Sequence, residues 1–297
     1  MSRVIVTGAN GFIGRNLIKL LLSKDVEVIS IDINHDNSMF ISDERVIKLS
    51  SNMNDLDSLY EEIGEGGFDC FYHFAWQGTT GVARSDYSMQ MNNVKLTCDA
   101  ALLSKKLNCK KFVTTGTITE KIAENSLRCK YNSENLVYGL SKLYAHQLLE
   151  IVSQKNEINY VWAKLSNIYG GDNKNGNLIS YTLSQFKENK IPEYGPCEQP
   201  YDFMYIDDVV NLLFLIGFKN TNNNEYFLGS GNPRKLKEYL EIVSNIFNKE
   251  IAIGKKEDDG VKYDIEWFNI GDLAEFDYEN IKSFEQAITD IKNEVDK

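Results

Sequence analysis

The chain has 297 residues, of which 42% are hydrophobic and 25% charged, and it contains only four prolines. This composition is typical of a globular protein with one large domain or two smaller ones, and the net charge of −11, without a basic cluster, argues against nucleic acid as a partner. Three isolated histidines and five scattered cysteines without CxxC spacing give no metal-ligand pattern and indicate reduced thiols.

The first half of the chain alternates short apolar strands with helical stretches, as a parallel sheet with crossover helices requires. The predicted strands are residues 4–8, 26–32, 45–49, 69–76, 110–117 and 159–170, the last of which runs into a loop. The predicted helices are residues 11–23, 55–63, 91–107 and 134–153. This order predicts an α/β fold with a Rossmann-type doubly wound parallel sheet.

The character of the sequence changes after Gly170. GDNKNGN (171–177) is polar and loop-like, and an apolar-periodic helix, a Pro/Gly-containing stretch (191–200) and a helix near 207–218 follow. We therefore predict a Rossmann-type domain at residues 1–168, to which the chain returns near 200–218. A smaller, mainly substrate-binding domain is predicted at residues 169–297. Ligands of open parallel sheets bind beyond the carboxyl ends of the strands, so we expect this domain to fold over the same crevice.

The segment TGANGFIG directly follows the first predicted strand and opens the first predicted helix. Glycine permits the tight turn and lets the backbone approach a pyrophosphate, while the amides of the helix N-terminus point at the anion. The alternative is a strand-to-helix turn without a ligand. The candidate cofactor-binding residues of this turn are Gly8, Asn10, Gly11, Phe12, Ile13 and Gly14.

Asp32 ends the second predicted strand, 18 residues after Gly14. An acid there can accept hydrogen bonds from both ribose hydroxyls of an adenosine and would repel a 2′-phosphate. Asp32 therefore favours NAD over NADP as the cofactor, although NADPH stays open. A solvated aspartate at a strand end is the alternative.

Tyr138 and Lys142 lie four residues apart in LVYGLSKLY, on one face of a predicted helix. A phenol normally loses its proton near pH ~10, and a cation beside it lowers that pKa toward working pH. The pair can therefore be a proton donor with its electrostatic partner. Taken alone, the pattern is more typical of ordinary packing.

These motifs, taken in order, resemble the extended short-chain dehydrogenases/reductases, the NAD-dependent epimerase/dehydratase family that acts on nucleotide-linked sugars. HFAW resembles the family's His-hydrophobe-Ala-Ala strand end, and YGLSK its Tyr-x-x-x-Lys. The resemblance is carried by TGANGFIG (7–14), HFAW (73–76), NNVKLT (92–97), KFVTTGT (111–117), YGLSK (138–142), LSNIYG (165–170) and YDFMYIDDV (201–209).

The resemblance implies a catalytic set of Thr117, Tyr138 and Lys142. Thr117 would hydrogen-bond the substrate oxygen, Tyr138 would exchange a proton with it, and Lys142 would tune the phenol and hold the nicotinamide ribose. Hydride transfer to a carbonyl builds alkoxide charge that a positioned acid must neutralise, which suits these roles.

The resemblance also implies binding residues around this set. Ala75 and Trp76 would line the cofactor cleft by their main chain. Gln77, Thr117 and Asn167 are the candidate substrate-binding residues, although Asn167 can also be a plain turn residue. For Asn93, helix capping or polar packing is as compatible with the pattern as a direct role.

The sequence departs from the family pattern at positions that matter for chemistry. Where sugar-nucleotide dehydratases carry Asp-Glu after the catalytic Thr, this chain has Ile118 and Thr119, and Glu120 comes one position late. The acid and base that expel water are therefore missing, so we do not expect dehydration.

Other departures affect binding. Tyr201 replaces the Arg that commonly clamps the substrate diphosphate, so Arg234, Lys164 or Arg84 would have to substitute, unless these are simply solvated surface residues. The family's Gly in the NNVKLT segment is Leu96, and its Asp after the third strand is Asn52, which weakens the case for an adenine contact there.

We therefore expect an NAD(P)H-dependent reductase of the C4 keto group of a nucleotide-linked 4-keto-6-deoxyhexose, in deoxysugar biosynthesis. The alternative is a nucleotide-sugar epimerase with tightly bound NAD, and a third possibility is a non-catalytic dinucleotide-binding protein. The N-terminal segment enters a strand at once and no apolar run approaches ~20 residues, so we expect a cytoplasmic protein without a membrane partner. The family's helix pairing implies a homodimer, although burial of the same helices within the monomer fits the pattern as well.

Overall fold

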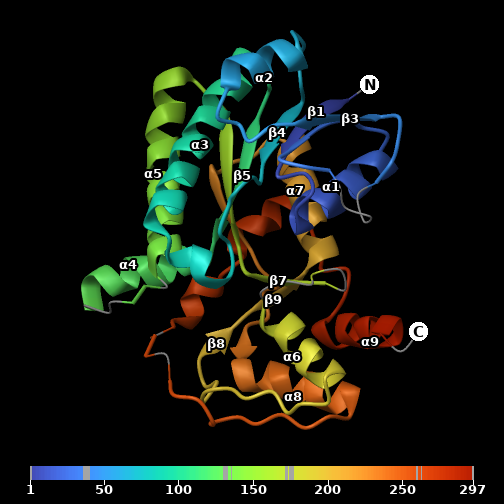
Figure 1. The fold of residues 1–297 in the computed structure, drawn as a ribbon, viewed down its shortest axis with the longest axis vertical. Coiled ribbons are helices and arrows are strands. Elements are labelled where there is room, and N and C mark those ends of the chain that lie inside the picture. Colours follow the sequence, from blue (N-terminus) through green and yellow to red (C-terminus); the bar gives the residue numbers. More distant parts are fainter. Residues whose placement is uncertain are drawn as a thin grey trace.

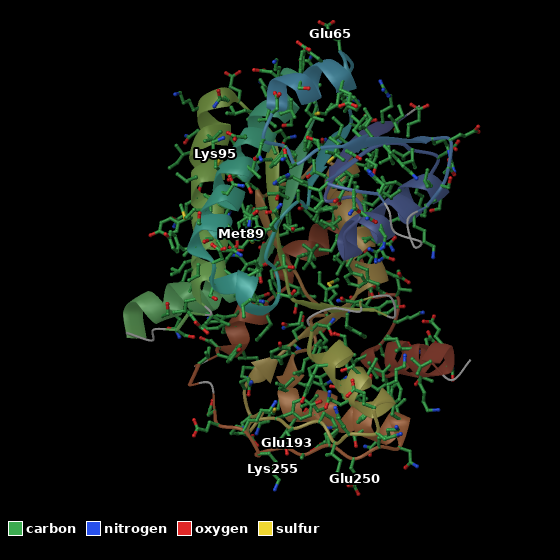
Figure 2. The ribbon with its side chains drawn as sticks, viewed as in Figure 1. Glu65, Met89, Lys95, Glu193, Glu250 and Lys255 are labelled. Atoms are coloured by element: carbon green, nitrogen blue, oxygen red, sulfur yellow. The ribbon has the colours of Figure 1, made fainter. Side chains whose placement is uncertain are left out.

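A computed structural model describes residues 2–35, 41–129, 133–134, 136–170, 173, 177–258, 260–261 and 263–295. A larger sheet layer and a smaller lobe follow one another along the long axis (Figure 1). Figure 2 shows Glu65 at the end of the sheet layer, and Glu193, Glu250 and Lys255 at the opposite end, on the lobe. No helix among the described residues is long and apolar enough to cross a membrane.

The sheet has seven parallel strands in the order β10-β6-β5-β4-β1-β2-β3, which confirms the predicted Rossmann-type fold. The crossover between β3 and β4 leaves the topological switch beside β1, where ligands of such sheets bind. The strands are β1 (Arg3–Thr7), β2 (Glu27–Asp32), β3 (Val46–Ser50), β4 (Cys70–His73), β5 (Phe112–Thr117), β6 (Tyr160–Leu165) and β10 (Glu225–Leu228).

Helices cover both faces of this sheet (Figure 1). On one face, α1 and α7 pack against Val4, Val6 and Tyr72, and on the other, α3 and α5 pack against Ile5 and Phe71. Burying each such side chain contributes ~1.5–3 kcal/mol. The helices of the sheet layer are α1 (Phe12–Ser23), α2 (Leu56–Ile63), α3 (Tyr87–Lys106), α4 (Thr119–Cys129), α5 (Leu136–Asn156), α7 (Ile206–Phe218) and the short 3-10 helix η1 (Gly81–Ser85).

Three features differ from the sequence prediction. The strand predicted at 159–170 is interrupted at Ser166, whose N–H donates to Leu228 O (2.9 Å) and whose hydroxyl donates to Asp202 O (2.8 Å). The chain then continues as β7 (Asn167–Tyr169), which leaves the sheet and pairs with β9 (Phe203–Tyr205) between the sheet layer and the lobe (Figure 1). Helix α4 and the edge strand β10 were not predicted.

The smaller lobe has its own aromatic core. Tyr169, Phe203, Tyr239 and Phe284 are buried against one another with ring centroids 4.7–5.9 Å apart. Such edge-to-face contacts fix the lobe on β7 and β9, at the mouth of the sheet. The lobe contains α6 (Leu178–Lys187), β8 (Pro200–Tyr201), β11 (Arg234–Lys235), α8 (Leu236–Phe247), α9 (Phe284–Val295) and the 3-10 helices η2 (Ile265–Phe268) and η3 (Gly271–Phe276), the last of which packs back on β10.

Candidate active site

A cleft of about 960 Å³ runs from the glycine-rich turn, past the carboxyl ends of the strands, to the lobe. This volume is at the upper end of the range of ligand pockets. The cleft is lined by most residues that the sequence singled out: Gly8, Asn10, Gly11, Phe12, Ile13, Gly14, Trp76, Thr117, Tyr138, Lys142 and Asn167. Asp32, Ala75 and Gln77 are not among its lining residues, but each is bonded or adjacent to one that is.

The glycine-rich turn packs so closely against neighbouring backbone that Gly8 and Gly14 have no room for a side chain. Gly8 has a φ of +65°, and a Cβ there would lie 2.6 Å from the backbone of Phe74 and Ala75. A Cβ on Gly14 would lie 2.3 Å from Gly8 O. Helix α1 then starts without a side-chain cap, so its first amides face the cleft, and Asn10 Oδ1 is buried without a hydrogen-bond partner. The uncapped start of α1 and the unpartnered Asn10 Oδ1 fit the binding of a dinucleotide.

Asp32 ties the end of β2 to this turn. Its Oδ2 accepts a hydrogen bond from the Asn10 amide and its Oδ1 one from the Ile33 amide, both at 2.8 Å. Each carboxylate oxygen keeps a further lone pair for a ligand hydroxyl. The acid thus stands at the strand end beside the glycine turn.

His73, the histidine of HFAW, connects neighbouring strands of the sheet. His73 is buried, its Nδ1 shares a hydrogen bond with Thr7 Oγ1 (2.8 Å), and its carbonyl accepts from Thr114 Oγ1 (2.8 Å). Burial lowers the pKa of His73 to about 3, so the ring is neutral. His73 thereby joins β1, β4 and β5 below the cleft.

Asn93 fixes the segment after β4. It is buried inside α3, which starts at Tyr87 with Asp86 as its cap, so the capping alternative for Asn93 is wrong. Its amide accepts from the Gln77 N–H (3.0 Å) and donates to Gln77 O (2.8 Å). Asn93 therefore holds the main chain of Gln77, whose side chain is exposed.

The three candidate catalytic residues meet at the mouth of β5. Thr117 Oγ1 accepts from the Thr119 amide (3.3 Å) and hydroxyl (3.1 Å), which leaves its own proton for another acceptor. Tyr138 and Lys142 come from the first turns of α5. Lys142 Nζ donates to Thr115 O (2.8 Å) and lies 3.7 Å from the centroid of the Trp76 ring.

Burial governs the ionisation of this pair. It raises the pKa of Tyr138 to about 12, against the opposing effects of Arg84 and Thr117. It also lowers the pKa of Lys142, against the stabilising effect of Glu120. Both groups are therefore biased toward their neutral forms, as expected in a desolvated site.

Glu120 points away from the cleft. Its carboxylate is buried, accepts from the Thr117 amide (2.7 Å) and Trp162 Nε1 (3.2 Å), and lies 3.6 Å from Lys164 Nζ. Glu120 thus fixes the end of β5 from behind. Among the described lining residues of the cleft there is no Asp or Glu.

The cations considered as replacements for the missing clamp lie in different places. Lys164 is buried in ion pairs with Glu120 and Glu225. Arg234 pairs with Glu285 (2.6 Å) and lines a separate cavity of about 270 Å³ in the lobe. Of the three, only Arg84 lines the cleft, where Tyr201 also lies.

Several lining residues were not predicted as site residues. Arg15 follows the glycine turn, and its guanidinium donates to Asn10 O (2.6 Å). Asn177 caps α6 by accepting from the Ser180 amide (2.7 Å), and its Nδ2 donates to Ile168 O (2.9 Å). The Asn-x-x-Ser spacing before an apolar helix was the available signal. The remaining unpredicted lining residues include Thr79, Thr80, Thr119 and Asn173.

Comparison with known proteins agrees with this geometry. The chain is 25% identical over 250 residues to a CDP-abequose synthase of Salmonella muenchen, covering 81% of this chain and 79% of that protein. It is 27% identical over 249 residues to a dTDP-6-deoxy-L-talose 4-dehydrogenase (NAD(+)) of Aggregatibacter actinomycetemcomitans, covering 80% and 88%.

The fold is similar to that of a UDP-N-acetylglucosamine 4-epimerase from Methanobrevibacter ruminantium M1, solved with UDP-N-acetylmuramic acid. The TM-score is 0.81 at 20% identity, and the match covers 99% of this chain and 98% of the other. Residues 4–229 match the NAD dependent epimerase/dehydratase family. This match spans the glycine turn, the three candidate catalytic residues and the start of the lobe, so the chain belongs to the NAD-dependent epimerase/dehydratase family, as the order of its motifs predicts.

Proposed function

We propose that the protein reduces the C4 keto group of a nucleotide-linked 4-keto-6-deoxyhexose with NADH or NADPH, in deoxysugar biosynthesis. The observation that carries this proposal is the convergence of Thr117, Tyr138 and Lys142 on a cleft that starts at the glycine turn. One relative is named as a 4-dehydrogenase of a dTDP-linked 6-deoxy sugar, which supports redox chemistry at this carbon.

The electrostatics of the cleft suit two phosphorylated ligands. Arg15 and Arg84 line it, and none of its described lining residues is acidic, although the chain as a whole carries a charge of −11. Such a local cationic field attracts dinucleotides and sugar nucleotides. Asp32 and the glycine turn would hold the adenosine end of the cofactor, which supports NADH as the reductant.

The chain's own residues handle the charge that reduction creates. The cofactor, when bound, would supply a hydride to C4. The Thr117 hydroxyl then donates a hydrogen bond to the substrate oxygen, and the Tyr138 phenol delivers the proton that completes the alcohol. Lys142, whose Nζ donates to Thr115 O, lines the same cleft. No carboxylate is needed in this sequence of steps.

The test offers the purified protein a panel of nucleotide-linked 4-keto-6-deoxyhexoses and intact nucleotide hexoses with NADH or NADPH. We expect stoichiometric oxidation of the cofactor with a keto sugar. A Tyr138→Phe variant should lose roughly 10²–10⁴-fold in kcat while it still binds the cofactor. If no keto sugar is reduced and an intact sugar is isomerised instead, the reductase assignment is wrong.

A nucleotide-sugar 4-epimerase is the rival function, since the same three residues could oxidise and then reduce the substrate. Retention of the cofactor separates the two. An epimerase should purify with NAD and act without added reductant, whereas a reductase exchanges its cofactor at every turnover.

We further propose a homodimer in the cytoplasm. Large apolar side chains of the adjacent helices α3 and α5 are exposed, and this supports pairing with a second copy: Tyr87 (75%), Met91 (50%), Tyr144 (54%), Leu148 (43%) and Ile151 (62%). Sedimentation should find a dimer that an Ile151→Glu substitution dissociates. A monomeric wild-type protein would refute the pairing.

A further inference from the structure

We propose that Arg84, held in place by Gln90, is the cation that stabilises the phenolate form of Tyr138. This inference rests on the proposed function, since the phenolate forms when Tyr138 gives its proton to the substrate. Arg84 lies in the 3-10 helix η1, outside the family motifs. The proposal gives Arg84 a share in tuning the Tyr138 phenol, a role that the resemblance gives to Lys142 alone.

The first observation is the position of the two cations. The guanidinium carbon of Arg84 lies 4.3 Å from the centroid of the Tyr138 ring, over its face. Lys142 Nζ instead donates to Thr115 O and lies over the Trp76 ring, which itself meets Tyr138 edge-on at 6.2 Å. The cation in direct contact with the Tyr138 ring is therefore Arg84.

The second observation is the way the structure fixes Arg84. Gln90 is fully buried at the start of α3, and its amide oxygen accepts from Trp76 Nε1 (2.8 Å). Its amide nitrogen donates to Gly78 O (2.8 Å) and Ala83 O (3.0 Å). One buried side chain thus ties both ends of the segment from Trp76 to Ala83, and Arg84 follows directly.

The charged and polar groups around Tyr138 come from separate elements. Arg84 comes from η1, Lys142 from α5, Thr117 from β5 and Glu120 from α4. Arg84 and Thr117 lower the pKa of Tyr138, whereas burial and Glu120 raise it. An opposite charge a few ångströms away commonly lowers the pKa of an acid by 1–3 units, so Arg84, over the ring, offsets part of the effect of burial.

Arg84 is therefore a positioning and tuning residue that acts through Tyr138. Its partly exposed side chain donates a hydrogen bond to Thr79 O (3.3 Å), so its replacement leaves the buried core untouched. A cation on the face of the ring also restrains the ring's orientation toward the cleft.

The experiment titrates Tyr138 in the NAD⁺-saturated protein by tyrosinate absorbance. Because the chain has 16 tyrosines, each protein is measured against the same protein carrying Tyr138→Phe, and the difference isolates Tyr138. The variants are Arg84→Met, Arg84→Lys and Gln90→Leu. Arg45→Met is the matched control, since Arg45 pairs with Asp43 and Asp25 away from the cleft.

We expect Arg84→Met to raise the titration midpoint of Tyr138 by about one unit, a tenfold weaker acid. Arg84→Lys should restore part of this shift, Gln90→Leu should give a smaller rise, and the control should match wild type. An unchanged midpoint in Arg84→Met overturns the inference. The titration needs no sugar, so failure to reduce any keto sugar would sink the proposed function while leaving this result standing.

Discussion

The sheet layer and the lobe hold their parts of the cleft by different means. In the sheet layer the site is made of main-chain turns and buried polar contacts, such as the Gly8–Gly14 turn and the bond from the Thr117 amide to Glu120. In the lobe, cleft residues such as Asn177 and Tyr201 stand on an aromatic core that includes Phe203. The sheet side of the cleft therefore tolerates little substitution, whereas the lobe can change its lining without losing its core.

The largest expected effect comes from adding one methyl group to the turn. In Gly14→Ala the new Cβ would meet backbone atoms of Gly8 and Ala9, which cannot move aside as a side chain can. NAD affinity, measured by calorimetry, should fall by roughly 100-fold or more. Gly67→Ala, where a Cβ would meet nothing within 4 Å, should bind like wild type. Equal affinities for both variants would show that the turn is not the cofactor site.

The next prediction concerns the buried polar contacts of the sheet layer. Burial raises the pKa of Glu120 from 4.5 to about 6, so its ionisation destabilises the folded state as the pH rises through this range. The stability of Glu120→Gln relative to wild type should therefore increase by ~2 kcal/mol between pH ~4.5 and ~7. Urea unfolding at several pH values measures it, with the partly exposed Glu124→Gln as the control. A relative stability that falls with pH would contradict the raised pKa.

Asp32 offers a smaller test on the same side. Asp32→Asn keeps the side-chain shape but removes the charge that would repel a 2′-phosphate. The ratio of kcat/KM for NADH over NADPH should drop about tenfold, ~1.4 kcal/mol. If the ratio does not change, Asp32 has no part in choosing the cofactor, and its bonds to the Asn10 and Ile33 amides explain it fully.

The smallest effect is expected in the lobe. Asn177→Ala removes the cap of α6 and the bond to Ile168 O, which should cost ~1 kcal/mol of stability. The KM for the sugar nucleotide should rise a few-fold, whereas cofactor affinity should stay the same. Ser184→Ala, on the same helix, serves as the control. A loss of cofactor affinity in Asn177→Ala would contradict the expectation that the lobe affects only sugar binding.

The same contrast explains what could be predicted from the sequence. Strand and helix alternation and the spacing of TGANGFIG and YGLSK predict the fold and its family, because they reflect local geometry that every such sheet repeats. Trp76 was predicted only as a main-chain contact, and Arg84 only as one of several cations. Both side chains contact the Tyr138 ring in a segment that Gln90 holds. Gln90 is buried and bonds residues up to 14 positions away in sequence, and motif spacing does not predict such contacts.

Helix α4 and strand β10 show the limit for secondary structure. TEKIAENSLRC has few large apolar residues, so α4 carries a weak periodic signal. EYFL is short and follows a polar loop, so its strand signal in the sequence is weak. It forms a strand by pairing with the edge of β6. Tertiary context decided both elements.

The pairing of β10 with β6 affects the order in which the sheet can form during synthesis. All residues of β6 are buried, and the strand that covers its edge, Glu225–Leu228, leaves the ribosome some sixty residues after it. Until then the nascent sheet presents an unpaired apolar edge, the kind of surface on which unfinished chains associate. The sheet therefore gains its edge strand only after the polar loop that precedes β10 has been synthesised.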